Sequence, residues 1–124
     1  MPNLSYKSHD DLIAAWGPDL TIGLLYGPPN PDGTDVIEPD AGSGYARLPI
    51  TFTKVQADGV TYLTNDANII FGPADTTDWQ PVDTFGIFDA AGDLRVYGRL
   101  RTTRTVTINL GAAFPIDDIQ LRLR

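Results

Sequence analysis

The stretch of residues 84–100 reads TFGIFDAAGDLRVYGRL, and its pattern decides the fold class. It opens on a short run of β-formers, passes through turn residues at 89–93, and continues at 94–100 with apolar residues that alternate with polar ones. Two strand patterns on either side of a Gly-containing turn predict a β-hairpin. Gly86 and Gly98 fall inside these strands, where a missing side chain indicates that another group packs closely against the backbone.

Similar strand patterns continue along the chain. Further strands are expected at residues 20–26, 45–53, 60–63, 68–71, 105–110 and 119–124. Pro49 inside the second of these predicts an edge strand or a bulge, because proline lacks the N–H group that a ladder needs. The Asp58-Gly59 pair predicts a tight turn. Seven or eight short strands with regular turns predict an all-β fold, a two-layer antiparallel sandwich that is jelly-roll-like.

One short helix is expected near the N-terminus. Ser8 precedes Asp11 by three residues, which is the spacing of a capping box at a helix start. The apolar residues at positions 12, 13 and 16 then share one face, so Trp16 should dock the helix on the sheets, and Gly17 ends it. His9, the one histidine of the chain, is expected at the surface or in the helix cap.

Length and composition are those of a small folded domain. The chain has 124 residues and a mass of 13.5 kDa, which fits a single domain over residues 1–124. It has no cysteine, so disulfides and thiolate metal sites are excluded. No apolar run approaches the roughly 20 residues of a membrane span, and the first residues lack the pattern of a secretion signal. A soluble protein without a cleaved leader is therefore expected.

Charge is distributed unevenly along the chain. Nine basic and sixteen acidic residues give a net charge of −7, which opposes binding to nucleic acid and to anionic membranes. Residues 1–94 hold three of the basic and fourteen of the acidic residues, whereas residues 95–124 hold six arginines and two aspartates. Either segments from both ends neutralise each other within the sheets, which is the preferred interpretation, or oppositely charged faces meet between subunits.

A long acidic loop is expected at residues 27–44, which are rich in glycine and proline. This loop, the arginine-rich end and one tryptophan form the candidate contact surface. The interface candidates are Arg95, Arg99, Arg101, Arg104, Arg122, Arg124, Asp32, Asp35, Glu38, Asp40 and Trp79. Trp79 lies among Asp, Thr and Pro residues, so it either faces a partner or closes one end of the sandwich.

No catalytic or cofactor site is expected. A catalytic triad would need His9, which lies in the helix cap. The acid pairs Asp117-Asp118 and Asp75 with Asp78 lie in turns, where water keeps carboxylates ionised. The loop at 27–44 fails the EF-hand spacing because prolines occupy its first and last ligand positions, although a looser oxygen cage from its acids stays open. No glycine pattern for phosphate binding in nucleotides occurs. We therefore expect no enzymatic activity, cofactor or metal.

Several short sequence words occur in an order that resembles a known family. They are GYAR at residues 44–47, an asparagine at the start of 68–71, Asp78-Trp79, GIFDA at 86–90, a G-x-L step at 98–100 and Thr105-Val106. In this order the chain resembles small bacteriophage virion proteins that are often labelled tail-fibre proteins. The resemblance spans nearly the whole chain. It implies an assembly module on the exterior of the phage particle, assembled in the host cytoplasm.

No heptad or collagen-like repeat occurs that could form the shaft of a fibre. A compact acidic module without a shaft favours a capsid decoration or cement protein. Such a protein would be a homotrimer that bridges subunits of the major capsid protein or binds another virion protein. The alternative is a tail-fibre or receptor-contacting module that presents aromatic side chains to host glycan. A glycan-hydrolysing enzyme is the third and weakest hypothesis.

Overall fold

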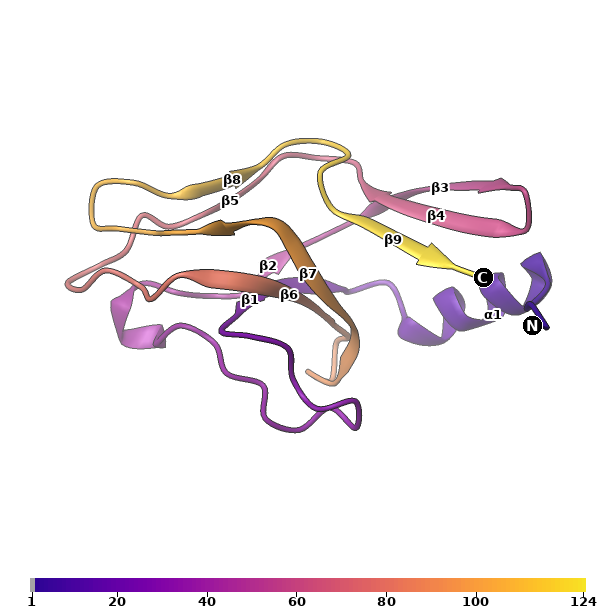
Figure 1. The fold of residues 1–124 in the computed structure, drawn as a ribbon, viewed down its shortest axis with the longest axis horizontal. Helices are drawn as coiled ribbons and strands as arrows, with labels where there is room; N and C mark the ends of the chain where they lie inside the picture. Colours follow the sequence, from indigo (N-terminus) through magenta and orange to yellow (C-terminus); the bar gives the residue numbers. More distant parts are fainter. Residues whose placement is uncertain (1) are drawn as a thin grey trace.

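The chain folds mainly into antiparallel β-strands (Figure 1), as the sequence predicts. The computed structural model describes residues 2–124. In chain order its elements are α1 (Tyr6–Trp16), β1 (Thr21–Leu25), the short 3-10 helix η1 (Ala41–Ser43), β2 (Leu48–Pro49), β3 (Phe52–Ala57), β4 (Val60–Asn65), β5 (Ile69–Phe71), β6 (Val82–Phe88), β7 (Leu94–Arg104), β8 (Ala112–Phe114) and β9 (Gln120–Leu123). Each strand pair in this part of the chain is antiparallel. The all-β fold class with one short N-terminal helix is confirmed.

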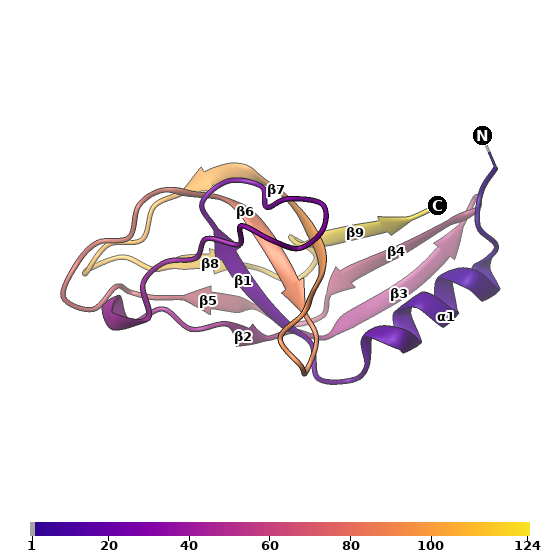
Figure 2. The ribbon, with the colours of Figure 1, turned by 90° about the horizontal axis from the view of Figure 1, so that it is seen from below.

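The strands form three sheets, which are arranged as a body and an arm (Figure 1, Figure 2). The body contains the four-stranded sheet β2-β1-β6-β7 and the two-stranded sheet β5-β8. The arm contains the three-stranded sheet β3-β4-β9, and α1 lies along one face of it. Body and arm lie end to end along the longest axis, so the molecule is elongated.

Side chains from both sheets of the body share one core. Phe71 of β5 and Phe114 of β8 pack edge to face with ring centroids 6.1 Å apart, and Phe71 stacks on Tyr45 at 6.2 Å. Ile22 of β1 and Ile87 of β6 are fully buried in the same core. Two sheets that bury their facing side chains together form a β-sandwich. The core continues into the arm through buried residues of β4 and β9.

The hairpins expected from the turn residues are present. β6 pairs with β7 across the turn that follows β6, and β3 pairs with β4 across Asp58 and Gly59. Both residues have positive φ angles, 55° and 78°, which suit a two-residue hairpin turn of type I′. A Cβ on Gly98 would lie 3.1 Å from a ring carbon of Phe85, and Gly86 is crowded in the same way. The predicted close approach at both glycines is therefore confirmed.

The segment 45–53 forms two strands where the sequence predicts one. β2 consists of Leu48–Pro49 only and lies at the edge of the four-stranded sheet, where Pro49 pairs with Thr21 of β1. The edge position predicted for Pro49 is confirmed, since the missing N–H group costs least there. β3 begins at Phe52 and belongs to the arm. The chain thus leaves the body for the arm directly after this proline.

Two expectations for the helix are wrong. α1 begins at Tyr6, and its N-cap is Ser5 instead of Ser8, because the Ser5 hydroxyl oxygen accepts a hydrogen bond from the Ser8 backbone N–H at 3.2 Å. His9 is fully buried and does not lie at the surface. The other end agrees with the expectation, since Gly17 caps the helix with a φ of 82°. The spacing of Ser8 and Asp11 is insufficient to locate the N-cap, because Ser5 can also act as an N-cap residue.

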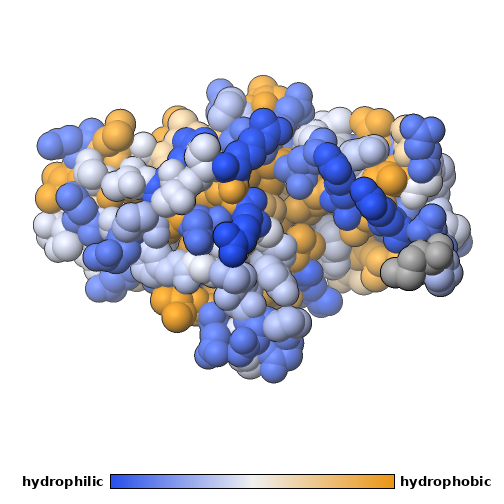
Figure 3. All heavy atoms as spheres, in the orientation of Figure 1, coloured by the Kyte–Doolittle hydropathy of each residue, from blue (hydrophilic) through white to orange (hydrophobic). Residues whose placement is uncertain are grey.

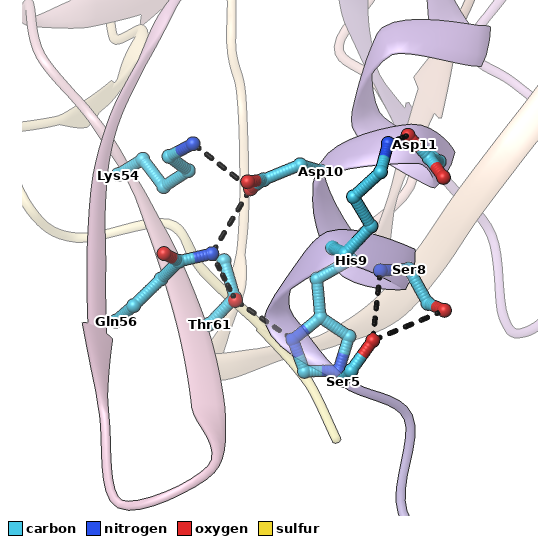
Figure 4. Close-up of polar contacts among 9 residues, drawn as sticks. Ser5, Ser8, His9, Asp10, Asp11, Lys54, Gln56 and Thr61 are labelled. Atoms are coloured by element: carbon cyan, nitrogen blue, oxygen red, sulfur yellow. Dashed lines mark hydrogen bonds and ion pairs between the residues drawn. The ribbon is translucent and has the colours of Figure 1, made fainter.

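Polar contacts hold α1 on the arm (Figure 4). The ring Nδ1 of His9 lies 2.8 Å from Oγ1 of Thr61. The side-chain amide of Gln56 donates to Thr61 Oγ1 at 3.1 Å and to the Asp10 carboxylate at 2.9 Å. Lys54 also donates to Asp10 at 2.9 Å, and this bond lowers the pKa of Asp10. His9 is thus buried because it faces β4, more than fifty residues away in sequence.

The strand expected at residues 105–110 is not formed. Val106 is fully buried, but Ile108 and Leu110 are exposed. Thr107 and Leu110 each donate a backbone N–H to the other's carbonyl oxygen, at 2.9 and 3.3 Å, so the chain turns back at this point. The prediction is wrong because the alternating pattern continued through a turn. The strand β8 follows this turn and pairs with β5.

Candidate functional site

The strand β7 bends away from its neighbour part-way along its length (Figure 1). It pairs with β6 as far as Arg99, which lies opposite Thr84, and the next paired residue, Arg104, lies opposite Val82. Four residues of β7 therefore stand opposite one residue of β6, and residues 100–103 bulge out of the ladder. β7 also lies at the edge of its sheet, opposite the β2 edge. The bend opens a hollow between β7 and β9.

We name this hollow the arginine groove. It has a volume of about 450 Å³. Its lining residues are Phe85, Arg99, Leu100, Arg101, Thr102, Arg104, Phe114, Asp118, Ile119, Gln120 and Arg122. Figure 3 shows strongly hydrophilic side chains over β7 and β9, with apolar surface between them. Buried aromatic and aliphatic side chains thus form the floor of the groove, and arginines form its rim.

Arg104 is fixed at one side of the groove by three contacts. Its Nη1 donates to the carbonyl oxygen of Ala113 at 3.0 Å, and its Nη2 lies 3.6 Å from a carboxylate oxygen of Asp118. Its guanidinium carbon lies 4.7 Å from the centre of the Phe114 ring. An arginine held by a carbonyl, a carboxylate and an aromatic face has a structural role.

Arg122 reaches the groove from β9 on the opposite side. Its Nε and Nη2 both donate to Oε1 of Gln120 at 3.3 Å, and its guanidinium carbon lies 5.8 Å from the centre of the Tyr62 ring. Gln120 is neutral, so these contacts position the guanidinium without compensating its charge.

Arg99 and Arg101 are exposed residues of β7 on the rim of the groove. Among residues 2–124, no carboxylate oxygen lies within the 4.0 Å of an ion pair from either guanidinium. Asp118 is the one acid of the lining, and it is already paired with Arg104. Four arginines against one aspartate leave three uncompensated positive charges in the groove, although the whole chain has a net charge of −7.

Two of the six candidate arginines lie outside the groove. Arg95 donates through Nε to a carboxylate oxygen of Asp89 at 2.8 Å. The backbone N–H groups of Asp93 and Ala91 donate to the other oxygen of Asp89. Arg95 and these two bonds lower the pKa of Asp89. Arg124, the last residue, is exposed and does not line the groove.

The acids of the loop at 27–44 do not gather into one site. Apart from η1, this segment is a loop as predicted. Asp32 accepts from Thr34, Asp35 from Asn30, and Asp40 from the backbone of Gly42. The bonds from Thr34 lower the pKa of Asp32. Within residues 2–124 no three side chains of the metal-binding types converge, so the oxygen cage that the sequence left open is not formed.

Glu38, the fourth acid of the loop, belongs to a cluster that the sequence analysis missed. Arg47 donates to its carboxylate through Nη2 at 2.7 Å and through Nε at 3.1 Å. The Tyr45 hydroxyl donates to the same carboxylate and accepts from the backbone N–H of Leu24 at 3.1 Å. The guanidinium carbon of Arg47 lies 3.5 Å from the centre of the Phe88 ring. The bond to Glu38 raises the pKa of Arg47, and burial, followed by the bond to Glu38, raises that of Tyr45.

The two oppositely charged parts of the chain, residues 1–94 and 95–124, neutralise each other only to a small extent. In the part of the chain that the structure describes, the acidic loop forms its ion pair with Arg47, and the arginines of 95–124 form theirs with Asp89 and Asp118. The preferred interpretation of the uneven charge is confirmed in part: strands of residues 95–124 pair with strands of residues 1–94, but Arg95 with Asp89 is the one ion pair that joins the two parts among residues 2–124. Contact between charged faces of neighbouring subunits stays a prediction.

Trp79 lies in the core, with 4% of its surface exposed. Its indole Nε1 donates to the carbonyl oxygen of Ser43 at 2.9 Å, and its ring packs edge to face on Tyr45 at 5.4 Å. This burial favours the interpretation that Trp79 closes one end of the sandwich. A role of Trp79 in an interface stays a prediction, and its buried side chain argues against it.

The carboxylates considered for catalysis support turns. Asp78 accepts from the backbone N–H of Ile108 at 2.9 Å, and Asp75 accepts from the backbone N–H of Thr76 at 3.0 Å. Asp118 pairs with Arg104, as described above. Carboxylates that accept backbone N–H groups stabilise the local chain conformation.

The comparison with known families covers most of the chain. Residues 14–122, which include the whole lining of the arginine groove, match the family model described as Podophage GP4 fiber I protein gp80. The chain belongs to this family of podophage fibre proteins. The match supports the resemblance to phage tail-fibre proteins. A fibre protein is a component of the virion. No curated protein and no solved structure matches it. Among the residues described, no helix has the length and apolar character to cross a membrane.

Proposed function

We propose that this chain is a non-enzymatic module of a podophage fibre that lies on the exterior of the virion and binds the host cell surface. Membership of a fibre family supports the fibre role. The arginine groove supports the binding role and is the observation that carries it. Arg99, Arg101 and Arg122 line it without an ion-pair partner among residues 2–124, whereas Arg47, Arg95 and Arg104 each pair with an acid of the fold.

The chemistry of the groove suits recognition better than turnover. Its one carboxylate, Asp118, is engaged with Arg104. Arginine keeps its proton under all physiological conditions, so the arginines of the lining cannot act as general bases. They supply charge and directed N–H donors, which are the requirements of a binding site.

A position on the head shell is the weaker proposal. The sequence favours a cement protein that bridges subunits of the major capsid protein, but the matching family is described by a fibre protein. Trimer formation and the identity of the virion partner stay predictions.

Adsorption measurements test this proposal. Host cells are incubated with an excess of the purified chain before virions are added, and free virions are counted over time. Occupied receptors should lower the adsorption rate several-fold, whereas an unrelated acidic protein of similar size should leave it unchanged. Unchanged adsorption, together with heads that burst more easily when virions are stripped of this protein, would contradict the proposal and favour a cement protein.

A further inference from the structure

The arginine groove holds charge that the fold itself does not use. Arg99, Arg101 and Arg122 line it without a carboxylate partner among residues 2–124. We propose that the groove binds a phosphate group carried on a saccharide. This inference rests on the proposed function and names the chemistry of the surface ligand.

The residue type favours phosphate. A guanidinium presents five N–H donors in a planar fork that can bind two oxygens of one anion, which an ammonium group cannot do. All six basic residues of 95–124 are arginine. Arg99 and Arg101 come from β7 and Arg122 comes from β9, so two strands contribute arginines to the lining. A phosphate ester has three terminal oxygens and accepts more of these donors than a carboxylate does.

A single phosphate group offsets at least half of the uncompensated charge of the groove. The lining has three uncompensated positive charges, and a phosphate monoester carries about −1.5 to −2 at neutral pH. A neutral sugar would compensate none of this charge. A long polyanion would extend over a protein surface whose net charge is −7, and charges repel within a Debye length of about 8 Å. The groove therefore suits one local phosphate better than a nucleic-acid backbone.

The size and floor of the groove leave room for a sugar beside the phosphate. Its volume of about 450 Å³ lies within the range of roughly 300–1,000 Å³ that is usual for small-molecule sites. Half-buried Leu100 gives an apolar patch for the C–H face of a sugar ring, and Phe85 and Phe114 lie buried at the base of the groove. Thr102 and Gln120 supply a hydroxyl and an amide for hydrogen bonds to sugar hydroxyls.

The groove also opens onto the face of the arm that α1 leaves uncovered. Gln120 lines both the groove and a shallow depression on the arm. The other residues of that depression are Thr53, Val55, Tyr62, Thr64 and Asp117. The strand residues among them alternate with Lys54 and Leu63, which lie on the α1 side. Further sugar units of a glycan can extend from the groove along this face.

The acidic loop of a second copy is the main rival for the groove. Glu38 is already bound by Arg47 and Tyr45, and Asp32 and Asp35 accept hydrogen bonds within their own loop. Two copies, each with a net charge of −7, also repel each other at long range. A small anionic ligand therefore fits these observations better than a second subunit.

Titration with three sugars tests the inference on the purified chain. Glucose 6-phosphate, glucuronate and glucose share a pyranose ring and differ mainly in the anionic group. Glucose 6-phosphate should bind about tenfold more tightly than glucuronate, and glucose should not bind measurably, since charge-assisted hydrogen bonds dominate. The double variant Arg99→Ala/Arg101→Ala should weaken phosphate binding about tenfold or more, whereas Arg124→Ala outside the groove should change it less than about twofold. Equal thermal midpoints show that the variants fold.

Three results would overturn the inference. The first is equal affinity of the wild type and the double variant for glucose 6-phosphate, and the second is equal affinity of the wild type for glucuronate and glucose 6-phosphate. The third is a lower molecular mass of the double variant than of the wild type in solution, because loss of an oligomer would assign the groove to a subunit contact. The adsorption measurement separates this inference from the proposed function. If the double variant still blocks adsorption, the proposed function is supported and the phosphate-bearing saccharide is contradicted as its ligand. If the wild type binds glucose 6-phosphate in the groove but does not block adsorption, the phosphate site is supported and the proposed function is contradicted.

Discussion

Two arginine environments in this protein differ in what surrounds the charge. Arg47 lies in the body, where Glu38 accepts two of its N–H groups and Phe88 lies under its guanidinium plane. Arg99 and Arg101 lie beside the bend of β7, where no carboxylate of residues 2–124 is within ion-pair distance. The same side chain therefore stabilises the fold in one place and is available to a ligand in the other.

This difference shows that charge alone does not identify a binding site. The 27–44 loop contains the acidic interface candidates, yet their carboxylates accept hydrogen bonds from their own loop or pair with Arg47. The arginine groove has five charged residues, and three of them have no ion-pair partner among the described residues. Compensation of charge within the fold is what separates the two regions, and variants of each should behave differently.

The largest effect on stability is expected at the compensated site. Arg47→Ala removes both bonds to the Glu38 carboxylate, whose side chain is only 18% exposed, and should lower the free energy of unfolding by about 2 to 3 kcal/mol. Lys54→Ala is the matched control, because it breaks a half-exposed ion pair with Asp10 and should cost less than about 1 kcal/mol. Chemical denaturation measures both. Equal losses of unfolding free energy in the two variants would show that the pair of Arg47 and Glu38 contributes no more than an exposed ion pair.

A smaller effect is expected from one hydroxyl of the same cluster. Tyr45→Phe keeps the stacking on Phe71 but removes the oxygen that accepts from Leu24 and donates to Glu38, which should cost about 1 to 1.5 kcal/mol. Tyr97→Phe removes an exposed hydroxyl and should cost less than about 0.5 kcal/mol. Denaturation midpoints compare the two. If Tyr45→Phe is as mild as Tyr97→Phe, the hydroxyl contributes little to the cluster.

The ion pair at the start of β7 predicts a dependence on pH. Hydrogen bonds from Arg95, Asp93 and Ala91 lower the pKa of Asp89 below its usual 3.8. A carboxylate with a lowered pKa in the folded state stabilises the fold above the usual value, and this contribution is lost as the pH falls through the lowered pKa. Asp89→Asn should therefore reduce the thermal midpoint at neutral pH. The difference from the wild type should shrink below pH 3.8, and a constant difference would contradict the assignment.

The smallest effect on stability is expected at the arginine groove. Arg99→Ala and Arg101→Ala remove exposed side chains without a carboxylate partner in the described chain, so each should change the free energy of unfolding by less than about 0.5 kcal/mol. Arg104→Ala is the contrasting variant, because it removes the bonds to Ala113 and Asp118. Denaturation of the three variants should rank Arg104→Ala as the most destabilised. A larger loss at Arg99 or Arg101 would mean that the fold uses their charge.

The sequence predicts those parts of the fold that depend on neighbours along the chain. The turn at Asp58 and Gly59 is determined by two residues that tolerate positive φ angles. The hairpin of β6 and β7, the edge position of Pro49 and the last strand β9 depend on local patterns as well. Local conformational preference is sufficient for such features, which is why they are confirmed.

Features set by distant contacts were missed. His9 is buried because Thr61 of the arm faces it, and no local pattern around His9 contains that information. The alternation at 105–110 is genuine, but the backbone bonds between Thr107 and Leu110 turn the chain there. Periodicity records which side chains can share a face and does not record whether a partner strand is present.

The candidate site was predicted in part for the same reason. Four of the six candidate arginines line one groove, but the sequence gives no sign that the bend of β7 would bring them opposite Arg122. Tyr45 and Arg47 are two residues apart, which was a signal that they share a face. Nothing in the sequence connects them to Glu38 in the loop before them.

Chemical-shift mapping of the wild-type chain tests the assignment of the groove most directly. Backbone amide signals are recorded while glucose 6-phosphate is added, with glucose as the reference titration. We expect the phosphate-dependent shifts to be concentrated at residues 99–104 of β7 and 118–122 around β9, with the signals near Arg47 unchanged. Shifts centred on the loop at 27–44 or on Arg47, or no difference between the two sugars, would contradict the conclusion that uncompensated arginines form the binding site.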